Sequence, residues 1–211
     1  MAGSTAGLRT RNLHKLKSRQ RGHKTPIEQA GLFLKNFLRH PLMLGSVIPS
    51  SRYLIARVLD RIDWNQTNIV VEYGPGVGTF TRPILDRMAP QAKLLTIELN
   101  EEFAELLRAD ISDHRLHIAH GSAVEVQKWM HFNRLTQADL ILSGIPYTVL
   151  PADVRQRILT ATRDALTPSG SFVVYQYTRA VLPDLQRVFS RVEEEFEPLN
   201  ILPARVFRCW K

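Results

Sequence analysis

Short apolar runs alternate with amphipathic stretches over most of the chain. Runs rich in Val, Ile, Leu and Phe predict five strands, at residues 68–73, 93–98, 116–119, 138–143 and 171–178. Apolar positions at helical spacing fill the gaps between them, at residues 80–88, 101–111, 124–129 and 152–165. Strands that alternate with helices predict an α/β fold, in which a parallel sheet is covered on both faces.

The pattern changes after Pro183. A short helix is expected near residues 185–189, followed by two strands at 192–196 and 205–210. The two strands are close enough in sequence to pair with each other as an antiparallel hairpin. The predicted architecture is therefore a sheet of seven mostly parallel strands that ends in an antiparallel C-terminal hairpin.

Two amphipathic helices are expected before the first strand. One covers residues 27–40 and is stopped by Pro41; it either packs on its own domain or lies in a membrane interface, since it combines Phe33 and Phe37 with a basic side. The other starts after Pro49, with Ser50 or Ser51 as its N-cap. We expect a basic tail at 1–24, helices that bind a membrane and cap the substrate at 25–66, and a catalytic domain at 67–211.

Charge is concentrated at the N-terminus. The formal net charge is +8, and residues 1–24 carry seven Lys or Arg and no acid, which leaves +1 for the rest. Such a tail is either simply solvated or attracted to the phosphates of nucleic acid or to an anionic membrane. The longest stretch without a charged residue has 14 residues, fewer than a membrane span needs. A single cysteine, Cys209, excludes an internal disulfide and fits a cytosolic protein.

A glycine-rich loop follows the first predicted strand. Its sequence is Glu-Tyr-Gly-Pro-Gly-Val-Gly at residues 72–78, where glycines permit close approach of a ligand to the backbone. Glu98 follows Gly78 by 20 residues, at the end of the second strand, from which a carboxylate can bind both hydroxyls of a ribose. These features predict a nucleoside cofactor, whereas a dinucleotide site would have the spacing Gly-x-Gly-x-x-Gly.

The loop resembles motif I of class I S-adenosylmethionine-dependent methyltransferases, whose Rossmann-like seven-stranded sheet matches the predicted strand series. Within that class the chain is similar to the ribosomal RNA adenine dimethylase superfamily, with two departures. Gly121-Ser122-Ala123 stands where the superfamily has Asp-Ala, and Ser143-Gly144-Ile145-Pro146-Tyr147 where it has Asn-Leu/Ile-Pro-Tyr. Without the Asn amide, a flipped adenine loses a partner for its amino group. An RNA dimethylase would also carry a helical C-terminal domain.

The bacterial phospholipid N-methyltransferases, which methylate phosphatidylethanolamine stepwise toward phosphatidylcholine, are a better match. The resemblance rests on four segments, at residues 37–52, 72–78, 143–146 and 200–206. It implies S-adenosylmethionine as cofactor, a phospholipid substrate, no metal, and a cytoplasmic enzyme held peripherally on the inner face of the membrane by residues 1–40. Nucleic acid is then not the expected partner. Tyr147 replaces the family's usual small or apolar residue, and alternative acceptors are an ornithine lipid or, less in keeping with the motifs, ribosomal RNA adenine.

The expected site residues follow from these motifs. Cofactor contacts are predicted for Glu72, Gly74, Gly76, Gly78, Glu98, Leu99, Asn100, Ser122, Ala123 and Ser143. Aromatic rings at the ends of the fourth and fifth strands, Tyr147 and Tyr177, are the catalytic candidates because their faces would surround a cationic head group. The candidates for contacts with the substrate, including an anionic group on it, are Ser50, Ser51, Arg52, Ile145, Pro146 and Arg205.

Overall fold

The computed structural model describes residues 51–211. The predicted basic tail, the predicted helix at 27–40 and Ser50 lie outside the described residues. Ser51 is the N-cap of the first described helix, α2 (Arg52–Leu59), and its Oγ accepts a hydrogen bond from the Leu54 amide at 3.2 Å. Of the two serines proposed for this cap, the structure therefore assigns the role to Ser51.

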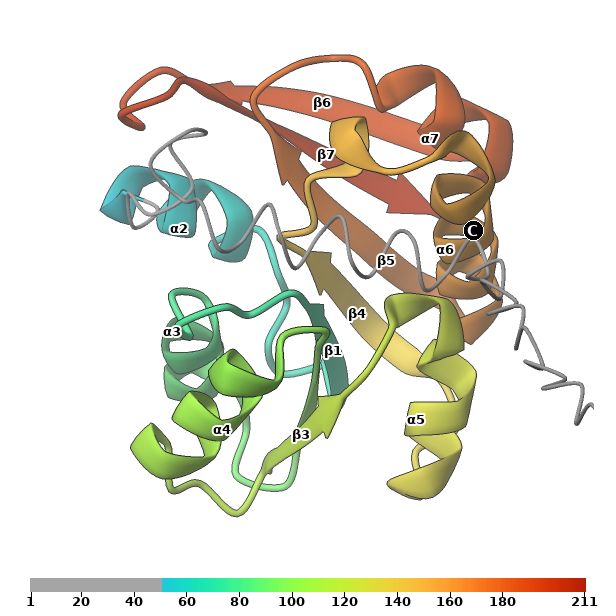
Figure 1. The fold of residues 1–211 in the computed structure, drawn as a ribbon. Helices are drawn as coiled ribbons and strands as arrows, with labels where there is room; N and C mark the ends of the chain where they lie inside the picture. Colours follow the sequence, from blue (N-terminus) through green and yellow to red (C-terminus); the bar gives the residue numbers. More distant parts are fainter. Residues whose placement is uncertain (1–50) are drawn as a thin grey trace, which may run out of the picture.

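The described residues form a seven-stranded sheet with the strand order β3-β2-β1-β4-β5-β7-β6 (Figure 1). The bounds are β1 (Ile69–Tyr73), β2 (Lys93–Glu98), β3 (Leu116–His120), β4 (Ala138–Ser143), β5 (Leu166–Gln176), β6 (Arg191–Glu197) and β7 (Ala204–Trp210). β1 to β5 are parallel, and β7 runs antiparallel to both of its neighbours. This confirms the predicted fold class and the C-terminal hairpin.

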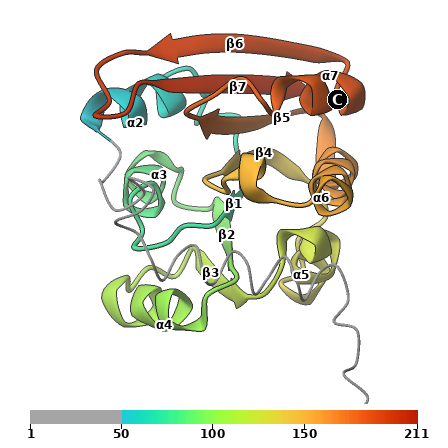
Figure 2. The same ribbon diagram turned by 45° about the horizontal axis from the view of Figure 1, so that its top comes forward.

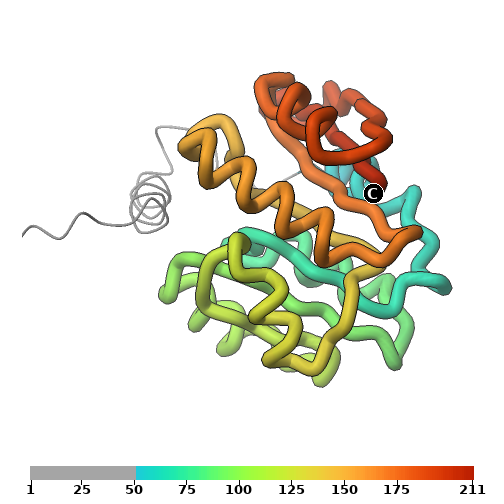
Figure 3. The backbone as a smooth tube through the Cα atoms, turned by 90° about the vertical axis from the view of Figure 1, so that its right-hand side faces the viewer, coloured from blue at the N-terminus to red at the C-terminus, as the bar shows by residue number. Residues whose placement is uncertain are grey.

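Helices cover both faces of the sheet (Figure 2). One face carries α2, α3 (Thr81–Arg87) and α4 (Glu101–Asp110). The other carries α5 (Val126–Phe132), α6 (Ala152–Ala165) and α7 (Leu182–Val188), with α6 crossing the front of the view in Figure 3. Two short 3-10 turns, η2 (Ala123–Glu125) and η3 (Tyr147–Val149), follow β3 and β4.

Successive strand residues point into two separate apolar cores. On β1, Val70 packs with α2 and α3, whereas Val71 packs with α5 and α6. The same alternation repeats along β5, where Val173 faces the first core and Phe172 the second. Because a strand turns successive side chains to opposite faces, a strand that is covered on both sides must be apolar at nearly every position. This is why the strands were recognisable as continuous apolar runs.

Two of the boundaries that differ from the sequence prediction involve proline. β5 begins at Leu166, directly after α6, and not at residue 171, although Pro168 and Gly170 are residue types common in turns. Its register against β4 shifts between the Ala138 and Leu140 pairs, so these residues form an irregular extended segment. α7 begins before Pro183 because proline is tolerated in the first helical turn, where its missing N–H has no intrahelical partner to lose.

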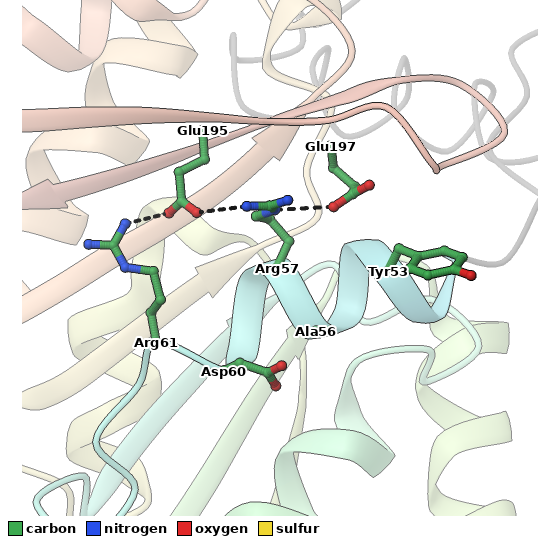
Figure 4. A pocket seen from close by; sticks show the side chains of 7 residues that line it. All are labelled: Tyr53, Ala56, Arg57, Asp60, Arg61, Glu195 and Glu197. Atoms are coloured by element: carbon green, nitrogen blue, oxygen red, sulfur yellow. Dashed lines mark hydrogen bonds and ion pairs between the residues drawn. The ribbon is translucent and has the colours of Figure 1, made fainter.

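α2 is fixed to the C-terminal hairpin by charged side chains (Figure 4). Arg57 bonds Glu197 at 3.1 Å, and Arg61 bonds Glu195 at 2.8 Å. The buried Arg208 on β7 pairs with Glu195 at 2.7 Å and donates to the carbonyl oxygens of Arg57 and Val58. Arg208 thus satisfies backbone groups near the end of α2 that lack helical partners.

Candidate cofactor and substrate site

Glycines occupy the first position beyond three of the parallel strands. Gly74 follows β1, Gly121 follows β3 and Gly144 follows β4. Each continues the ladder by one hydrogen bond, in which its amide donates to Ile97, Glu98 or Tyr73 respectively, at 3.0, 2.8 and 2.9 Å. The carboxyl edge of the sheet therefore has bare backbone where side chains would otherwise stand, and this is the edge at which open α/β sheets bind ligands.

The loop at residues 74–78 has the backbone conformation that its glycines permit. Gly76 has a φ of 55° and Gly78 a φ of 85°, both in the left-handed region. A Cβ on Gly76 would meet no heavy atom within 4 Å, whereas one on Gly78 would lie 3.0 Å from Leu107 of α4. Gly76 therefore borders open space that a ligand can use, and Gly78 lets the loop pack against α4.

Glu98 is held beside this loop. One carboxylate oxygen accepts from the Gly76 amide at 3.0 Å, and the other accepts from the Asn100 amide at 2.8 Å. The side chain is buried, and desolvation raises its pKa, although the backbone amides oppose this by stabilising the charged form. Asn100 itself caps α4 by accepting from the Glu102 amide, so Glu98, Leu99 and Asn100 form one ordered turn.

Glu72 lies beneath the loop and is a second buried carboxyl group. Burial raises its pKa to about 8, and the Thr81 hydroxyl, which donates to it at 2.7 Å, counteracts part of this shift. The nearby negative charge of Glu98 also raises the pKa of Glu72. Glu72 thus joins the end of β1 to the start of α3 through Thr81, a contact that the sequence analysis did not anticipate.

Ser122 and Ala123 stand at the corner after β3. Ser122 caps η2, with its hydroxyl accepting from the Val124 amide at 3.3 Å, and Ala123 is buried. The ring of Trp129 lies against Gly121, so closely that a Cβ on Gly121 would be 2.3 Å from its Cζ2. The indole Nε1 of Trp129 is buried and has no hydrogen-bond partner among residues 51–211. Trp129 is a site neighbour that sequence reasoning missed.

A Gly121→Ala substitution tests this packing. We expect it to lower the free energy of unfolding by about 1–3 kcal/mol, because the new methyl group overlaps the Trp129 ring. Urea unfolding measures the effect. In a Trp129→Leu background the smaller side chain leaves room, so the same Gly121→Ala change should cost much less; equal costs in both backgrounds would show that the ring is not the obstacle.

Ser143 and Tyr147 are turned into the core. The Ser143 hydroxyl donates to the Tyr147 phenol oxygen at 3.2 Å and accepts from the Ile145 amide at 3.3 Å. Tyr147 is fully buried, its ring packs edge-on against Phe172, and burial raises its pKa. Its predicted role of presenting a ring face to a head group needs an exposed ring, which this position does not provide. Ile145 is buried as well, and its carbonyl accepts from Gln176 at 2.8 Å.

Two other tyrosines line the same edge of the sheet. Tyr175 stacks on Phe80 with a centroid distance of 4.9 Å, and its hydroxyl lies 2.8 Å from where a Cβ on Gly144 would be. Tyr177, the first residue beyond β5, is 42% exposed. Of the two predicted catalytic tyrosines, only Tyr177 therefore presents an accessible ring, and its role stays a prediction.

The predicted anion-binding residues already have partners within the protein. Arg52 is exposed and lies over the ring of Tyr53, with its guanidinium carbon 4.9 Å from the ring centroid. Ser51 donates through its amide to Asn200 at 2.9 Å, besides capping α2. Arg205 on β7 pairs with Glu194, so an anionic substrate group would have to compete with that carboxylate. Pro146 stands half-buried between Ile145 and Tyr147.

A comparison with known proteins identifies the family of this chain. Residues 42–169 match the family model described as ribosomal RNA adenine dimethylase. The chain belongs to the ribosomal RNA adenine dimethylase family. Family membership confirms the predicted relationship to class I methyltransferases, and the cofactor is S-adenosylmethionine.

Relatives of this dimethylase-family chain include enzymes with different substrates. It is 29% identical over 184 residues to the ornithine lipid N-methyltransferase of Singulisphaera acidiphila, which covers 84% of this chain and 94% of that protein. It is 27% identical over 106 residues to ribosomal RNA small subunit methyltransferase A of Mycoplasma mycoides subsp. mycoides, covering 50% of this chain and 39% of that protein.

A solved structure shows the same fold. The 1,6-didemethyltoxoflavin-N1-methyltransferase of Burkholderia thailandensis, with bound 1,6-didemethyltoxoflavin and S-adenosylhomocysteine, superposes with a TM-score of 0.65 at 17% identity. The match covers 89% of this chain and 91% of the Burkholderia enzyme. The local geometry fits the cofactor: the backbone at Gly76 borders open space, and the carboxylate of Glu98 is held beside it. The individual contacts stay predictions.

Proposed function

We propose that the protein is an N-methyltransferase of an amino-lipid, with ornithine lipid as the first candidate acceptor. The observation that carries this proposal is the extent of the similarity to the Singulisphaera enzyme, which runs through 94% of that protein. Phosphatidylethanolamine, the acceptor expected from the sequence motifs, is the second candidate. Both lipids present a primary amine next to an anionic group, and the reaction at the nitrogen is the same.

The chemistry asks the protein mainly to position the acceptor and exclude water. S-adenosylmethionine supplies an electrophilic methyl group, which passes to the lone pair of a neutral amine. Glu98 and the glycine loop would hold the nucleoside, and the acceptor would approach along the same edge of the sheet. Tyr177, exposed at that edge, would present its ring face, which stabilises the single positive charge that the neutral nitrogen acquires in each methyl transfer. The amine proton must leave before each transfer, because an ammonium has no lone pair.

The geometry at the end of β4 argues against adenine as the acceptor. Recognition of a flipped base needs hydrogen-bonding groups that face the base edge. Ser143 is fully buried, and its hydroxyl already donates to Tyr147 and accepts from Ile145. It therefore offers the base neither a side-chain carbonyl nor a free hydroxyl. This supports a lipid acceptor over ribosomal RNA.

A lipid acceptor also implies where in the cell the protein acts. We propose that the protein acts at the cytoplasmic face of the cytoplasmic membrane, held there in part by the basic residues 1–24 and the amphipathic sequence at 27–40, since Lys and Arg side chains are attracted to anionic lipid. No helix among residues 51–211 has the length and apolar character needed to cross a bilayer.

Transfer of labelled methyl groups tests the acceptor. The full-length protein is incubated with methyl-labelled S-adenosylmethionine and, in separate reactions, vesicles containing ornithine lipid, vesicles containing phosphatidylethanolamine, and unmodified ribosomal RNA. We expect label in the ornithine lipid, on its free amine. Label only in phosphatidylethanolamine would keep the mechanism and change the acceptor, and label only in RNA would overturn the proposal.

A further inference from the structure

The loop that joins β6 to β7 has an unusual division of polar and apolar residues. We define residues 198–203, Pro-Leu-Asn-Ile-Leu-Pro, as the hairpin tip. Its five exposed residues are all apolar, and Leu199, Ile201 and Leu202 are 61%, 68% and 39% exposed. Large apolar side chains clustered at the end of a hairpin mark an interaction surface rather than ordinary surface composition.

The polar groups of this region are turned inward. Asn200 is only 7% exposed; its side-chain oxygen accepts from the Ser51 amide at 2.9 Å, and its side-chain nitrogen donates to the Leu202 carbonyl at 2.9 Å. Glu197, just before the tip, is 4% exposed, binds Arg57 and accepts from the Leu199 amide. The tip is thus a preformed turn with an apolar exterior, so no polar side chain would have to leave water if it entered an apolar phase.

Amphipathic residues flank the tip where it meets α2. Ser51, bonded to Asn200, is followed by the exposed Arg52 and by Tyr53, which is 41% exposed. No carboxylate among the described residues forms an ion pair with Arg52. Arginine and tyrosine are the side chains that favour the boundary between lipid head groups and acyl chains, because each has an apolar body and a polar end.

The tip and the methyl-transfer site project from the same edge of the sheet. β7 is antiparallel to β5 and pairs Arg205 with Gln176, the last residue of β5; Ala204 then pairs with Glu197, the last residue of β6. The tip therefore extends past the carboxyl edge on which the glycine loop and Tyr177 also lie (Figure 1). A surface that received the tip would face the opening of the site.

We propose that the hairpin tip inserts into the lipid bilayer, with Arg52 at the level of the anionic head groups, and thereby presents the carboxyl edge of the sheet to its lipid substrate. This inference rests on the proposed function. It assigns to residues 198–203 a membrane contact separate from that proposed for residues 1–40.

Insertion is measured directly with a fluorescent label at the tip. Ile201→Cys in the full-length protein is labelled with a nitrobenzoxadiazole dye; Cys209 is buried, and burial raises the pKa of its thiol, so the unsubstituted chain should take up no dye. On adding vesicles with about one third anionic lipid, we expect at least about a twofold rise in emission and quenching by a spin label on the acyl chain.

Phe132 supplies the matched control. It is 79% exposed at the end of α5, where the chain returns toward the start of β4 at the opposite edge of the sheet. Dye at Phe132→Cys should respond to neither vesicles nor quencher. Equal responses at Ile201 and Phe132, or none at Ile201, would overturn the inference. A rise at Ile201 with protein concentration in the absence of lipid would show that a second copy covers the tip, and would overturn it as well.

Activity separates this inference from the proposed function. The combined Leu199→Ser, Ile201→Ser and Leu202→Ser variant should methylate lipid in vesicles at least about tenfold more slowly, yet keep its rate on the same lipid dispersed in detergent, with Phe132→Ser unchanged in both. Unchanged activity on vesicles would contradict insertion. If the unsubstituted protein methylates no lipid in either form, the proposed function fails, while the dye at Ile201 still reports on insertion.

Discussion

Replacing Glu98 with glutamine is expected to weaken the binding of S-adenosylmethionine by roughly 100-fold, about 2.7 kcal/mol. Both carboxylate oxygens of Glu98 already accept from backbone amides, at Gly76 and Asn100. An amide group has only one oxygen, so the NH2 of glutamine must face one of these N–H groups. The substitution therefore disturbs the loop that borders the cofactor, and it also removes the charge that would bind the ribose hydroxyls.

Isothermal titration calorimetry measures this loss. Glu101→Gln is the matched control, because Glu101 is exposed in the first turn of α4, three residues away, and should affect binding by less than about twofold. The far-ultraviolet circular dichroism of both variants should equal that of the parent. Binding by the Glu98→Gln variant at nearly the parent affinity would remove Glu98 from the cofactor site.

Replacing Glu72 with glutamine is expected to change how stability depends on pH. The pKa of Glu72 is raised from 4.5 to about 8 in the folded protein, chiefly by burial. Between these two values the folded state holds a proton that the unfolded state has lost, so this group makes stability fall as pH rises, by at most about 1.4 kcal/mol per pH unit. Glutamine is neutral at every pH and can still accept from Thr81, so the variant should lack this contribution.

Urea unfolding at pH 5, 6, 7 and 8 tests this expectation. The variant should gain stability relative to the parent as the pH increases, and the gain should level off above pH 8. The contribution of His117, whose pKa is lowered by burial, cancels in this comparison because both proteins contain it. Thr81→Val, which removes the hydroxyl that stabilises the charged carboxylate, should raise the pKa of Glu72 further and extend the decline to higher pH. Parallel curves for parent and Glu72→Gln would mean that Glu72 does not titrate in this range.

The sheet was predictable because its strands are covered on both faces. β2 and β4 have the predicted bounds, since every position from Leu94 to Glu98 is buried and the apolar run reflects this directly. β5 was predicted to begin five residues too late because Pro168 and Gly170 have the composition of a turn. Local preference favoured a turn there, but pairing with β4 and the position of α6 keep the segment extended.

Contacts in the site were less predictable, because they depend on packing between distant elements. The loop glycines and Glu98 could be assigned from spacing alone, since they belong to one strand–loop–helix unit and the next strand. The ring of Trp129 lies over Gly121 only because α5 packs on that corner. Sequence likewise could not show that Tyr147 faces Phe172 in the core, or that the register of β6 against β7 places Glu194 beside Arg205.

The acidic run on β6 has a further consequence for association between molecules. β6 ends the sheet, so its outer backbone N–H and C=O groups have no neighbouring strand within residues 51–211. Unprotected edge strands recruit strands from other chains and promote aggregation. Glu193, Glu194 and Glu195 put three consecutive carboxylates on this edge, bound by arginines of the same molecule. A second molecule that extended the sheet would bring its own carboxylates alongside, and like charges on facing strands disfavour that pairing.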